Sequence, residues 1–294
     1  MRIHPSAVIG SQSKIGEDVK IGPFCVVENG VEIGNGCCLE SRATIKAGTI
    51  LGENNIVCEN AVIGGMPQHI AIHENCGTVV IGDGNVFREC LTVHRSMKES
   101  GATVIGDNGM FMANSHIAHD CRIGNNVVLV NNVLLAGHVC VEDRAILSGA
   151  AAVHQYSRIG TLAMVGGQSH VTQDVPPYMM VDGLCSRIVG LNLIGLRRAG
   201  FSIEDIKQIK AAYRILFRSG LPWREVLKNL EAQFVSGPAE KLVKFLSGST
   251  RGILSERRTQ LGKPVLKIHD GDSEEGDEQG DSFSEAIPLK RNVG

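Results

Sequence analysis

The chain carries an apolar side chain at every sixth residue from Ile3 to Val171. Only three positions of this series are not apolar, namely His69, Asn75 and Glu99. A period of six fits neither the 3.6-residue turn of a helix nor the two-residue alternation of a plain strand, so it predicts one side of a coiled parallel β-structure. Three such hexads would form a triangular coil of about eighteen residues, with the apolar side chains stacked in columns along the axis.

The composition is typical of such a solenoid. Of 294 residues, 43% are hydrophobic but only 4% are aromatic, and 35 are glycines. Many glycines directly follow the apolar residue of a hexad, as Gly10, Gly16 and Gly34 do. We expect this position to lie near a corner, where Gly, Asp or Asn tolerates the positive φ that a sharp bend needs.

Charge, cysteines and hydropathy restrict the class of protein. A net charge of −2 leaves no basic excess for binding nucleic acid. The nine cysteines form no CxxC pair, so we interpret them as reduced small residues inside the prism, as expected in the cytoplasm. The repeat begins at Ile3 and no apolar run approaches the length of a membrane span, so we expect neither a signal peptide nor a transmembrane segment.

The repeat predicts a first domain over residues 1–188. Within it the hexads are interrupted at about 64–80 and 94–104, and both times the series returns in phase. Segments that loop out and return leave the stacking of the coils intact. Because loops on a rigid scaffold commonly carry binding groups, we expect these two loops to take part in function.

A helical domain is predicted over residues 189–255. Ser202 is placed to cap a helix, with Asp205 at the reciprocal position of a capping box. Pro222 and Pro238 each fit the first turn of a further helix. These helices would cover the last coil, whose open edge would otherwise favour aggregation.

The two C-terminal regions differ in charge. Between residues 197 and 251, eleven Lys or Arg stand against five acids. This excess is explained either by solvated helix faces or by a docking surface for an acidic protein. Residues 256–294 are polar, with eight acids between 270 and 285, and predict a disordered acidic tail.

Four histidines mark the candidate site: His116, His119, His138 and His154, with Asp120 beside the second. Because their spacing is close to the eighteen residues of one coil, they should lie on successive coils near one edge. They could be unspecialised histidines, a zinc site, or a general base with an orienting carboxylate, as in acyl transfer. Their alignment on one line favours the third interpretation.

The sequence resembles the acyl-carrier-protein-dependent UDP-N-acetylglucosamine O-acyltransferases of the hexapeptide-repeat superfamily, which catalyse the first step of lipid A synthesis. The likeness covers about residues 1–254. It rests on six segments: His-Ile-Ala-His-Asp at 116–120, Leu-Ala-Gly-His-Val at 135–139, Val-His-Gln at 153–155, Met-Val-Gly-Gly at 164–167, Gln-Asp-Val-Pro-Pro-Tyr at 173–178 and Ser-Thr-Arg-Gly at 249–252.

This resemblance implies a left-handed parallel β-helix that assembles as a homotrimer, with active sites between subunits. His119 would be the general base that removes the proton of the sugar 3-hydroxyl, and Asp120 would orient it. The backbone N–H of Gly137 would stabilise the oxyanion formed on the thioester carbonyl. No metal and no cofactor is implied.

The resemblance also implies the substrates. The donor would be a 3-hydroxyacyl thioester of acyl carrier protein, and Gly167 would leave room for a chain of about fourteen carbons. The basic neighbours of Arg198 would contact phosphates or the carrier protein. The residues that would bind the sugar nucleotide and the acyl chain are Gln68, His69, His116, His138, His154, Gln155, Gly167, Asn192 and Arg198.

The chain departs from the family pattern at four positions: His69, Ala71, Ile194 and Ala199 replace an acid, a lysine, an acid and a basic residue. The acceptor is therefore UDP-N-acetylglucosamine or a modified sugar nucleotide. Two further enzyme classes share the repeat: the N-acyltransferases of the same pathway, which carry an additional amino-terminal domain, and the acetyltransferases that use coenzyme A. A β-helix scaffold without catalytic activity would also account for the hexads.

Overall fold

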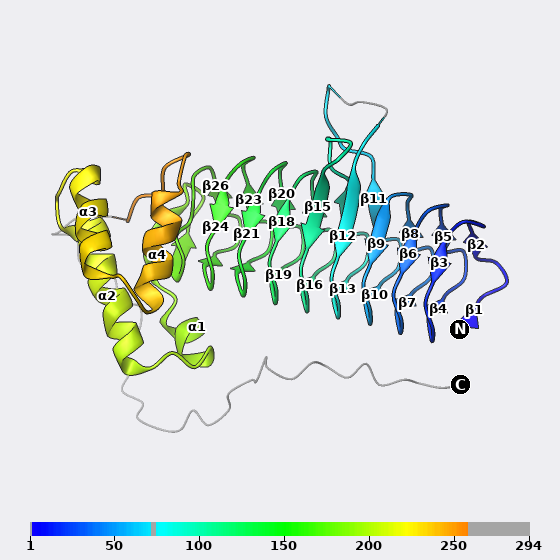
Figure 1. Ribbon diagram of the computed structural model, residues 1–294, viewed down its shortest axis with the longest axis horizontal. Helices are drawn as coiled ribbons and strands as arrows, with labels where there is room; N and C mark the ends of the chain where they lie inside the picture. The colour runs from blue at the N-terminus through cyan, green and yellow to red at the C-terminus, as the bar shows by residue number, and fades with distance from the viewer. Residues whose placement is uncertain (1, 72–74, 258–294) are drawn as a thin grey trace, which may run out of the picture. The chain divides into compact units, whose positions relative to one another are not determined.

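The computed structural model describes residues 2–71 and 75–257, which belong to one compact unit. In this part of the chain a parallel β-helix is followed by four helices at the C-terminal end of the stacked coils (Figure 1). Part of the predicted loop at 64–80 and almost all of the predicted acidic tail, residues 258–294, lie outside the described residues.

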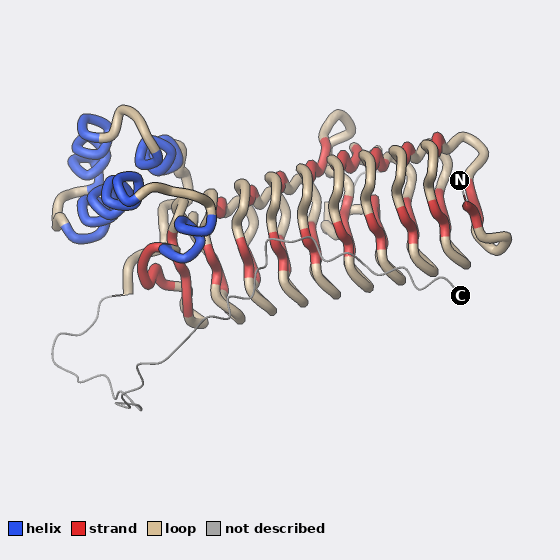
Figure 2. Tube along the Cα trace, turned by 90° about the horizontal axis from the view of Figure 1, so that it is seen from below, coloured by secondary structure: helices blue, strands red, loops and turns tan. Residues whose placement is uncertain are grey.

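Each coil contributes one short strand to each of three sheets, A, B and C, which form the faces of a prism (Figure 2). Sheet A contains β1 (Arg2–Ile3), β4 (Lys20–Ile21), β7 (Cys38–Leu39), β10 (Ile56–Val57), β13 (Val86–Phe87), β16 (Met110–Phe111), β19 (Val128–Leu129), β22 (Ile146–Leu147), β25 (Met164–Val165), β27 (Met179–Asp182) and β28 (Arg187–Leu191). Sheet B contains β2 (Val8–Ile9), β5 (Val26–Val27), β8 (Thr44–Ile45), β11 (Val62–Gly65), β14 (Thr92–His94), β17 (His116–Ile117), β20 (Leu134–Leu135), β23 (Ala152–Val153) and β26 (His170–Val171). Sheet C contains β3 (Lys14–Ile15), β6 (Glu32–Ile33), β9 (Thr49–Leu51), β12 (Thr78–Ile81), β15 (Ala102–Ile105), β18 (Arg122–Ile123), β21 (Cys140–Val141) and β24 (Arg158–Ile159). All strand pairs are parallel except the hairpin of β27 and β28.

The register of the coils explains the hexad pattern. Equivalent residues of adjacent coils lie 18 positions apart, as at the corner contact of Glu17 with Asn35. This spacing widens where the chain loops out. Val57 pairs with Phe87, 30 positions later, and Phe87 pairs with Phe111, 24 positions later. Both insertions are multiples of six, so the apolar series returns in phase after each.

The two insertions form loops at the same corner of the prism. The first loop, residues 66–77, connects β11 to β12, and the second loop, residues 95–101, connects β14 to β15. The three exceptions in the apolar series, His69, Asn75 and Glu99, all fall in these loops. The series therefore fails only where the chain leaves the prism.

The core consists of two sets of columns. The second residue of nearly every two-residue strand is an aliphatic hexad residue that is buried, as are Ile45 and Leu129. The residue two positions earlier is also buried and small, as Ala43 and Cys121 are. Cys25, Cys37 and Cys121 occupy these narrow positions as thiols, because a thiol behaves as a small apolar group. Stacked coils thus bury one large and one small side chain per strand.

The prediction for the corner glycines holds at Gly64, with a φ of 85°, but was wrong in its physical cause at others. Gly10 and Gly34, which directly follow an apolar hexad residue, do not have positive φ; that conformation occurs two residues later, as at Asn54 and Asn126. A Cβ on Gly34 would lie 2.6 Å from the backbone of Gly52 in the next coil. Glycine is needed there because the coils approach closely, not because of a left-handed bend.

The helical region contains α1 (Leu193–Arg198), α2 (Ile203–Arg218), α3 (Trp223–Gln233) and α4 (Pro238–Ser247). The predicted capping box is present, because Ser202 and Asp205 satisfy each other's backbone N–H groups at the start of α2. Pro238 opens α4 as predicted, whereas Pro222 is the residue just before α3. None of the four helices is long and apolar enough to cross a bilayer.

Candidate active site

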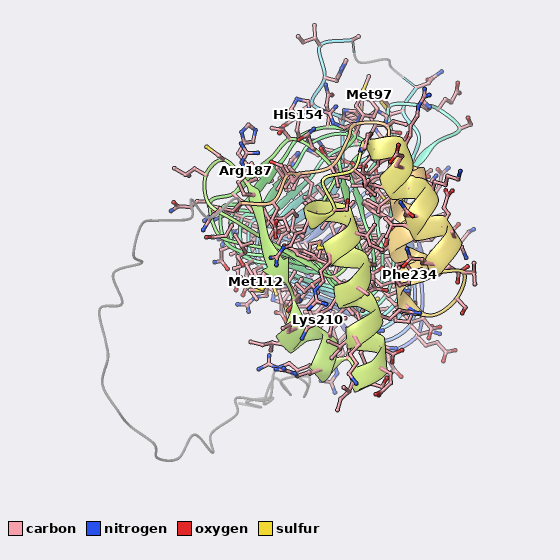
Figure 3. The ribbon with its side chains drawn as sticks, turned by 90° about the vertical axis from the view of Figure 1, so that its left-hand side faces the viewer. Met97, Met112, His154, Arg187, Lys210 and Phe234 are labelled. Atoms are coloured by element: carbon pink, nitrogen blue, oxygen red, sulfur yellow. The ribbon has the colours of Figure 1, made fainter. Side chains whose placement is uncertain are left out.

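The candidate residues gather at one edge of the prism, where the chain passes from sheet B to sheet C; we call it the site edge. Both loops leave from this edge, and the corners 118–121, 136–139 and 154–157 stack beside them. In the view along the coils, Met97 of the second loop and His154 lie on the same side of the prism (Figure 3). Repetition of one corner in successive coils thus places loop and histidine side chains together.

Register decides which side chains meet at these corners. Asp120, His138 and Tyr156 occupy equivalent positions in three successive coils, and all three have positive φ, between 60° and 63°. A left-handed backbone at residues other than glycine costs about 1–2 kcal/mol each, and here it recurs at corners throughout the prism, so the repeat itself imposes it. The ring of His138 consequently lies between Asp120 and Tyr156, and its stacking on Tyr156 is nearly parallel, with centroids 4.5 Å apart.

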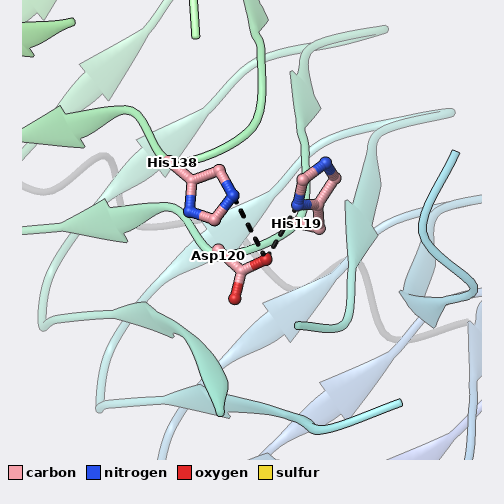
Figure 4. Close-up of side chains that lie close together, drawn as sticks. All are labelled: His119, Asp120 and His138. Carbon is pink, nitrogen blue, oxygen red and sulfur yellow. Dashed lines mark hydrogen bonds and ion pairs between the residues drawn. The ribbon is translucent and has the colours of Figure 1, made fainter. Parts of the chain in front are cut away.

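His119 and Asp120 form a dyad. Nδ1 of His119 lies 2.8 Å from Oδ2 of Asp120, and Nε2 of His138 lies 3.8 Å from the same oxygen (Figure 4). His119 is 7% exposed, so its ring is held by packing and has little freedom to reorient. A proton on Nδ1 that is donated to Asp120 leaves the lone pair of Nε2 free to accept another proton.

Asp120 is anchored by the second loop. Ser96 donates its hydroxyl to Oδ1 at 2.5 Å, and the backbone N–H of Met97 reaches Oδ2 at 3.2 Å. Burial raises the pKa of Asp120, but the hydrogen bonds from Ser96, His119 and Met97 outweigh it, so the pKa lies below its usual value. The carboxylate therefore stays ionised beside the imidazole.

Three further histidines lie near the dyad and favour their neutral forms. Burial lowers the pKa of His116, whose Nδ1 lies 2.7 Å from the hydroxyl of Thr92. Burial also lowers the pKa of His94, to about 4, and its ring packs edge-on against His116 at 4.8 Å. For His138, burial lowers the pKa although Asp120 opposes the shift. Neutral imidazoles can both donate and accept hydrogen bonds, as recognition of sugar hydroxyls requires.

Gly137 lies close to Nε2 of His119. A Cβ at this position would lie 2.6 Å from Nε2 of His119, so no larger residue fits without displacing the ring. Gly137 has no positive φ, so the glycine serves close approach here and not a left-handed turn. The space beside Nε2 is thus kept open by a glycine backbone.

The remaining predicted residues are placed as follows. His69, exposed on the first loop, reaches the dyad, with its ring edge-on to His119 at 5.7 Å, and Gln68 is exposed beside it. His154 and Gln155 are exposed at the next corner of the site edge. Gly167, on another corner, is exposed, and the atom nearest to an added Cβ would be the carbonyl oxygen of Gly149 at 3.3 Å.

The structure does not bring Asn192 and Arg198 to the dyad. Asn192 is buried before α1, where its side chain accepts the N–H of Gly195 and donates to the carbonyl of Leu162. Arg198 is exposed at the end of α1. Within one chain, both residues therefore lie at the C-terminal helices, away from the dyad.

Several residues of the site were missed by sequence reasoning. Ser96 and Thr92 hold Asp120 and His116, and Tyr156 stacks on His138. Tyr156 could have been predicted, because it lies eighteen residues, or one coil, after His138. Ser96 had no such signal, because it lies in a loop outside the repeat.

The dyad and His138 also form the one group among the described residues that could hold a metal ion. One donor atom from each of His119, Asp120 and His138 lies within 4.8 Å of the others. Two imidazoles and a carboxylate suit zinc or iron. However, Nδ1 of His119 and Oδ2 of Asp120 share a hydrogen bond, which a metal at these donors would have to break. The geometry thus fits the base interpretation more directly.

Sequence families match both parts of the chain. The family described as Udp N-acetylglucosamine O-acyltransferase, Domain 2, matches residues 174–254, and the bacterial transferase hexapeptide family matches residues 12–47 and 102–137. The acyl-[acyl-carrier-protein]–UDP-N-acetylglucosamine O-acyltransferase of Sinorhizobium fredii is 40% identical over 264 residues, which cover 89% of this chain and 98% of that protein. The enzyme of the same name from Anaeromyxobacter dehalogenans is 41% identical over 255 residues, 86% of this chain and 99% of its own. The chain belongs to this O-acyltransferase family.

Solved structures of UDP-N-acetylglucosamine acyltransferases are also similar to this chain. The structure from Francisella novicida has a TM-score of 0.83 at 39% identity, covering 86% of this chain and 94% of its own. That from Moraxella catarrhalis has a TM-score of 0.84 at 38% identity, covering 86% and 100%. Likeness to these O-acyltransferases confirms the predicted left-handed parallel β-helix with C-terminal helices. Membership of an enzyme family also removes the support for a non-catalytic scaffold.

Proposed function

We propose that this chain transfers a 3-hydroxyacyl group from acyl carrier protein to the 3-hydroxyl of UDP-N-acetylglucosamine. The observation that carries this proposal is the His119–Asp120 dyad with Gly137 against Nε2, in a chain about 40% identical to relatives named for these two substrates. The family resemblance assigns the roles, and the geometry supports them.

In the proposed reaction, Nε2 of His119 accepts the proton of the sugar 3-hydroxyl while that oxygen attacks the thioester carbonyl carbon. Asp120 accepts the hydrogen bond of the Nδ1–H group and, as a carboxylate, stabilises the imidazolium that forms. The backbone N–H of Gly137 stabilises the oxyanion. The intermediate collapses when the C–S bond breaks, and the thiolate of the carrier protein takes the proton back from His119. Neither a metal nor a cofactor enters any of these steps.

Substrate recognition is proposed for the residues around the dyad. Gln68, His69, His116, His138, His154 and Gln155 surround the reacting groups from the site edge. Arg198 would bind phosphates, and Asn192 would act by placing the start of α1. At the helical end, Lys210 and Arg214 line a pocket of about 210 Å³ together with Arg218, which Glu256 partly neutralises at 2.9 Å. These cations support docking of an acidic carrier protein.

Assembly as a homotrimer is proposed as well. Apolar and aromatic side chains are exposed at or next to the site edge, among them Leu134 at 50% and Tyr156 at 53%. Exposed apolar area of this kind favours contact with a second copy, which would also form the far wall of the acyl groove. Sedimentation equilibrium should give three times the chain mass, and a monomeric mass with full activity would contradict this assembly.

The decisive experiment measures acyl transfer from 3-hydroxyacyl carrier protein to UDP-N-acetylglucosamine, with the product identified by mass. We expect His119→Ala to lower the rate about 10²–10⁴-fold with the fold retained. His4→Ala, which changes an exposed histidine of the first coil, is the matched control and should be fully active. A chelator should leave the rate unchanged, and a rate that recovers only with added zinc would support a metal site instead. No product from the wild type would reject this acceptor or this function.

The acceptor has a second candidate, a modified sugar nucleotide. His69 lies in the cluster where the family pattern has an acid, and Ile194 is 63% exposed where the family pattern also has an acid. Both changes remove a carboxylate from the proposed sugar-nucleotide contacts. If the wild type with UDP-N-acetylglucosamine is inactive, the same assay with modified sugar nucleotides separates a changed acceptor from a lost activity.

The length of the acyl group is proposed from Gly167. Its exposed position leaves room for a chain of about fourteen carbons, and a bulky side chain there should block the end of the groove. Competition between donors of different length measures this preference. Gly167→Met should shift it toward shorter donors, and an unchanged preference would contradict the assignment.

A further inference from the structure

The second loop fixes Ser96 in the interior of the site edge. Ser96 has no exposed surface, although it lies in a loop outside the repeat. Its backbone N–H reaches the carbonyl of Thr78 at 3.3 Å, and its carbonyl accepts the N–H of Gly77 at 3.0 Å. Both partners lie where the first loop joins β12. Ser96 is therefore tied to the base of the loop that carries Gln68 and His69.

The hydroxyl of Ser96 has one proton and two possible acceptors. Oδ1 of Asp120 lies at 2.5 Å and the carbonyl of Lys98 at 3.2 Å, so the proton goes to the carboxylate. The oxygen in turn accepts the N–H of Lys98 at 3.0 Å. This chain of bonds connects the backbone of the second loop to Oδ1, whereas His119 uses Oδ2.

The loop is shaped around this hydroxyl. An added Cβ on Gly101 would overlap Oγ of Ser96, so only glycine leaves the hydroxyl in place. Gly101 has no positive φ, so its backbone gives no reason for glycine. The backbone N–H of Asp120 is held separately, by the hydroxyl of Thr103 at 2.8 Å. The hydroxyl of Ser96 thus holds Oδ1 of the carboxylate, beside the N–H of Met97 at Oδ2, whereas the position of the Asp120 backbone does not depend on Ser96.

We propose that Ser96 is a positioning residue for the acyl transfer, whose hydroxyl orients the carboxylate of Asp120 so that Oδ2 accepts the hydrogen bond of the Nδ1–H group of His119. This inference rests on the proposed function of the dyad. The second loop, the shorter of the two interruptions of the repeat, then has a definite purpose. The second loop supplies the hydroxyl of Ser96, because an uninterrupted four-residue corner of the repeat has no residue at this place.

The first test compares Ser96→Ala with Ser115→Ala in the full-length protein. Ser115 is equally buried and close in sequence to the dyad, but its hydroxyl bonds the carbonyl of Met112 in its own turn at 2.8 Å. Loss of a hydrogen bond to a charged group should lower kcat about 10- to 100-fold in Ser96→Ala, with both KM values within about twofold. Ser115→Ala should keep the wild-type kcat. Equal kcat values for the two variants would overturn the proposal.

Gly101→Ala displaces the same hydroxyl from outside and keeps the test valid if Ser96→Ala folds poorly. Alone it should reproduce the loss of kcat, because its methyl group occupies the place of Oγ. Added to Ser96→Ala it should cost little more, because the hydroxyl is already absent. If the kcat loss of the double variant equals the product of the two single losses, the two substitutions act independently, and the inference is rejected.

The pH dependence of kcat/KM gives a readout that loss of stability alone would not move. His119 and His138 face Asp120 directly, and Lys98 and His69 act on His138. Without the Ser96 donor the carboxylate of Asp120 becomes more basic and interacts differently with the proton on the base, so the acidic limb, which protonation of the base sets, should shift in Ser96→Ala but not in Ser115→Ala. An unmoved limb would contradict the proposal. An active His119→Ala would instead reject the dyad itself, so the two failures are distinguishable.

Discussion

Two edges of the prism have the same type of four-residue corner but different functions. At the edge between sheets C and A, which we call the ladder edge, a carboxylate or amide in five of the coils accepts a backbone N–H from the preceding coil at 2.7–2.8 Å. The acceptors are Asn35, Asp83, Asp107, Asn125 and Asp143. Such repetition satisfies corner amides and holds the coils in register.

The site edge uses equivalent positions for different side chains. At the corner position with positive φ the site edge has Asp120, His138 and Tyr156, whereas the ladder edge has residues outside the site, among them Asn108, Asn126, Arg144 and Leu162. Asparagine, aspartate and histidine enter this backbone region more readily than other residues with a Cβ, but the repeat imposes it at the corners on other residues too, as on Arg144 and Tyr156. The difference shows that a tolerant corner position can serve stability at one edge and chemistry at another, without any change in the strands between them.

The largest effect that separates the edges should come from Asp120→Asn. The amide cannot balance the charge on His119 and can hold the wrong tautomer, so we expect kcat to fall about 10²–10⁴-fold with the fold intact. Asp143→Asn is the matched control at the ladder edge and should keep its rate. Initial rates of acyl transfer measure both, and similar losses would mean that the site edge is not special.

Gly137→Ala should have the next largest effect. Its methyl group would overlap the ring of His119 and displace Nε2, so the rate should fall about 10- to 100-fold. Gly149→Ala serves as the control, because its added Cβ would have no neighbour closer than 3.5 Å. If the two glycine variants turn over equally fast, Nε2 of His119 is not the reacting atom.

Mild acid should destabilise the site edge. Burial lowers the pKa of His94 from 6.5 to about 4, so its neutral form stabilises the fold above pH 6.5, and this contribution is lost as the pH falls toward 4. Linkage gives a loss of about 2 kcal/mol in the free energy of unfolding between pH 7.5 and 5 from this residue. Urea unfolding of the wild type and of His94→Leu at both pH values measures it, with His4→Gln as control. An equally steep fall in His94→Leu would assign the acid sensitivity to other groups.

The smallest effect should come from Asp143→Ala at the ladder edge. Removal of one bond to the N–H of Asn125 should lower the free energy of unfolding by about 1 kcal/mol without changing kcat. Urea unfolding and initial rates are measured on the same preparation. A lower kcat with an unchanged free energy of unfolding would show that the ladder edge also serves catalysis, and would contradict this prediction.

Periodic features could be predicted from the sequence, and aperiodic ones could not. The hexads give the columns of Ile45 and Leu129, and the near-coil spacing of His119 and His138 gives a shared edge, because a fixed rise per coil converts sequence spacing into position. Ser96 reaches Asp120 through a loop whose path follows no repeat. The corner glycines were predicted in place but with the wrong cause, since coil-to-coil distance is not visible in one chain segment.

The closure of the last coil has a consequence for synthesis on the ribosome. Asp174 bridges to Ile253 and Ile188 to Glu256, so the end of the β-helix is completed by residues more than 65 positions further along the chain. Earlier coils contact only their neighbours and can stack in the order in which they emerge. The nascent protein therefore keeps an open sheet end until its last described residues are released, and we expect ribosome-bound chains to depend on chaperones at that stage.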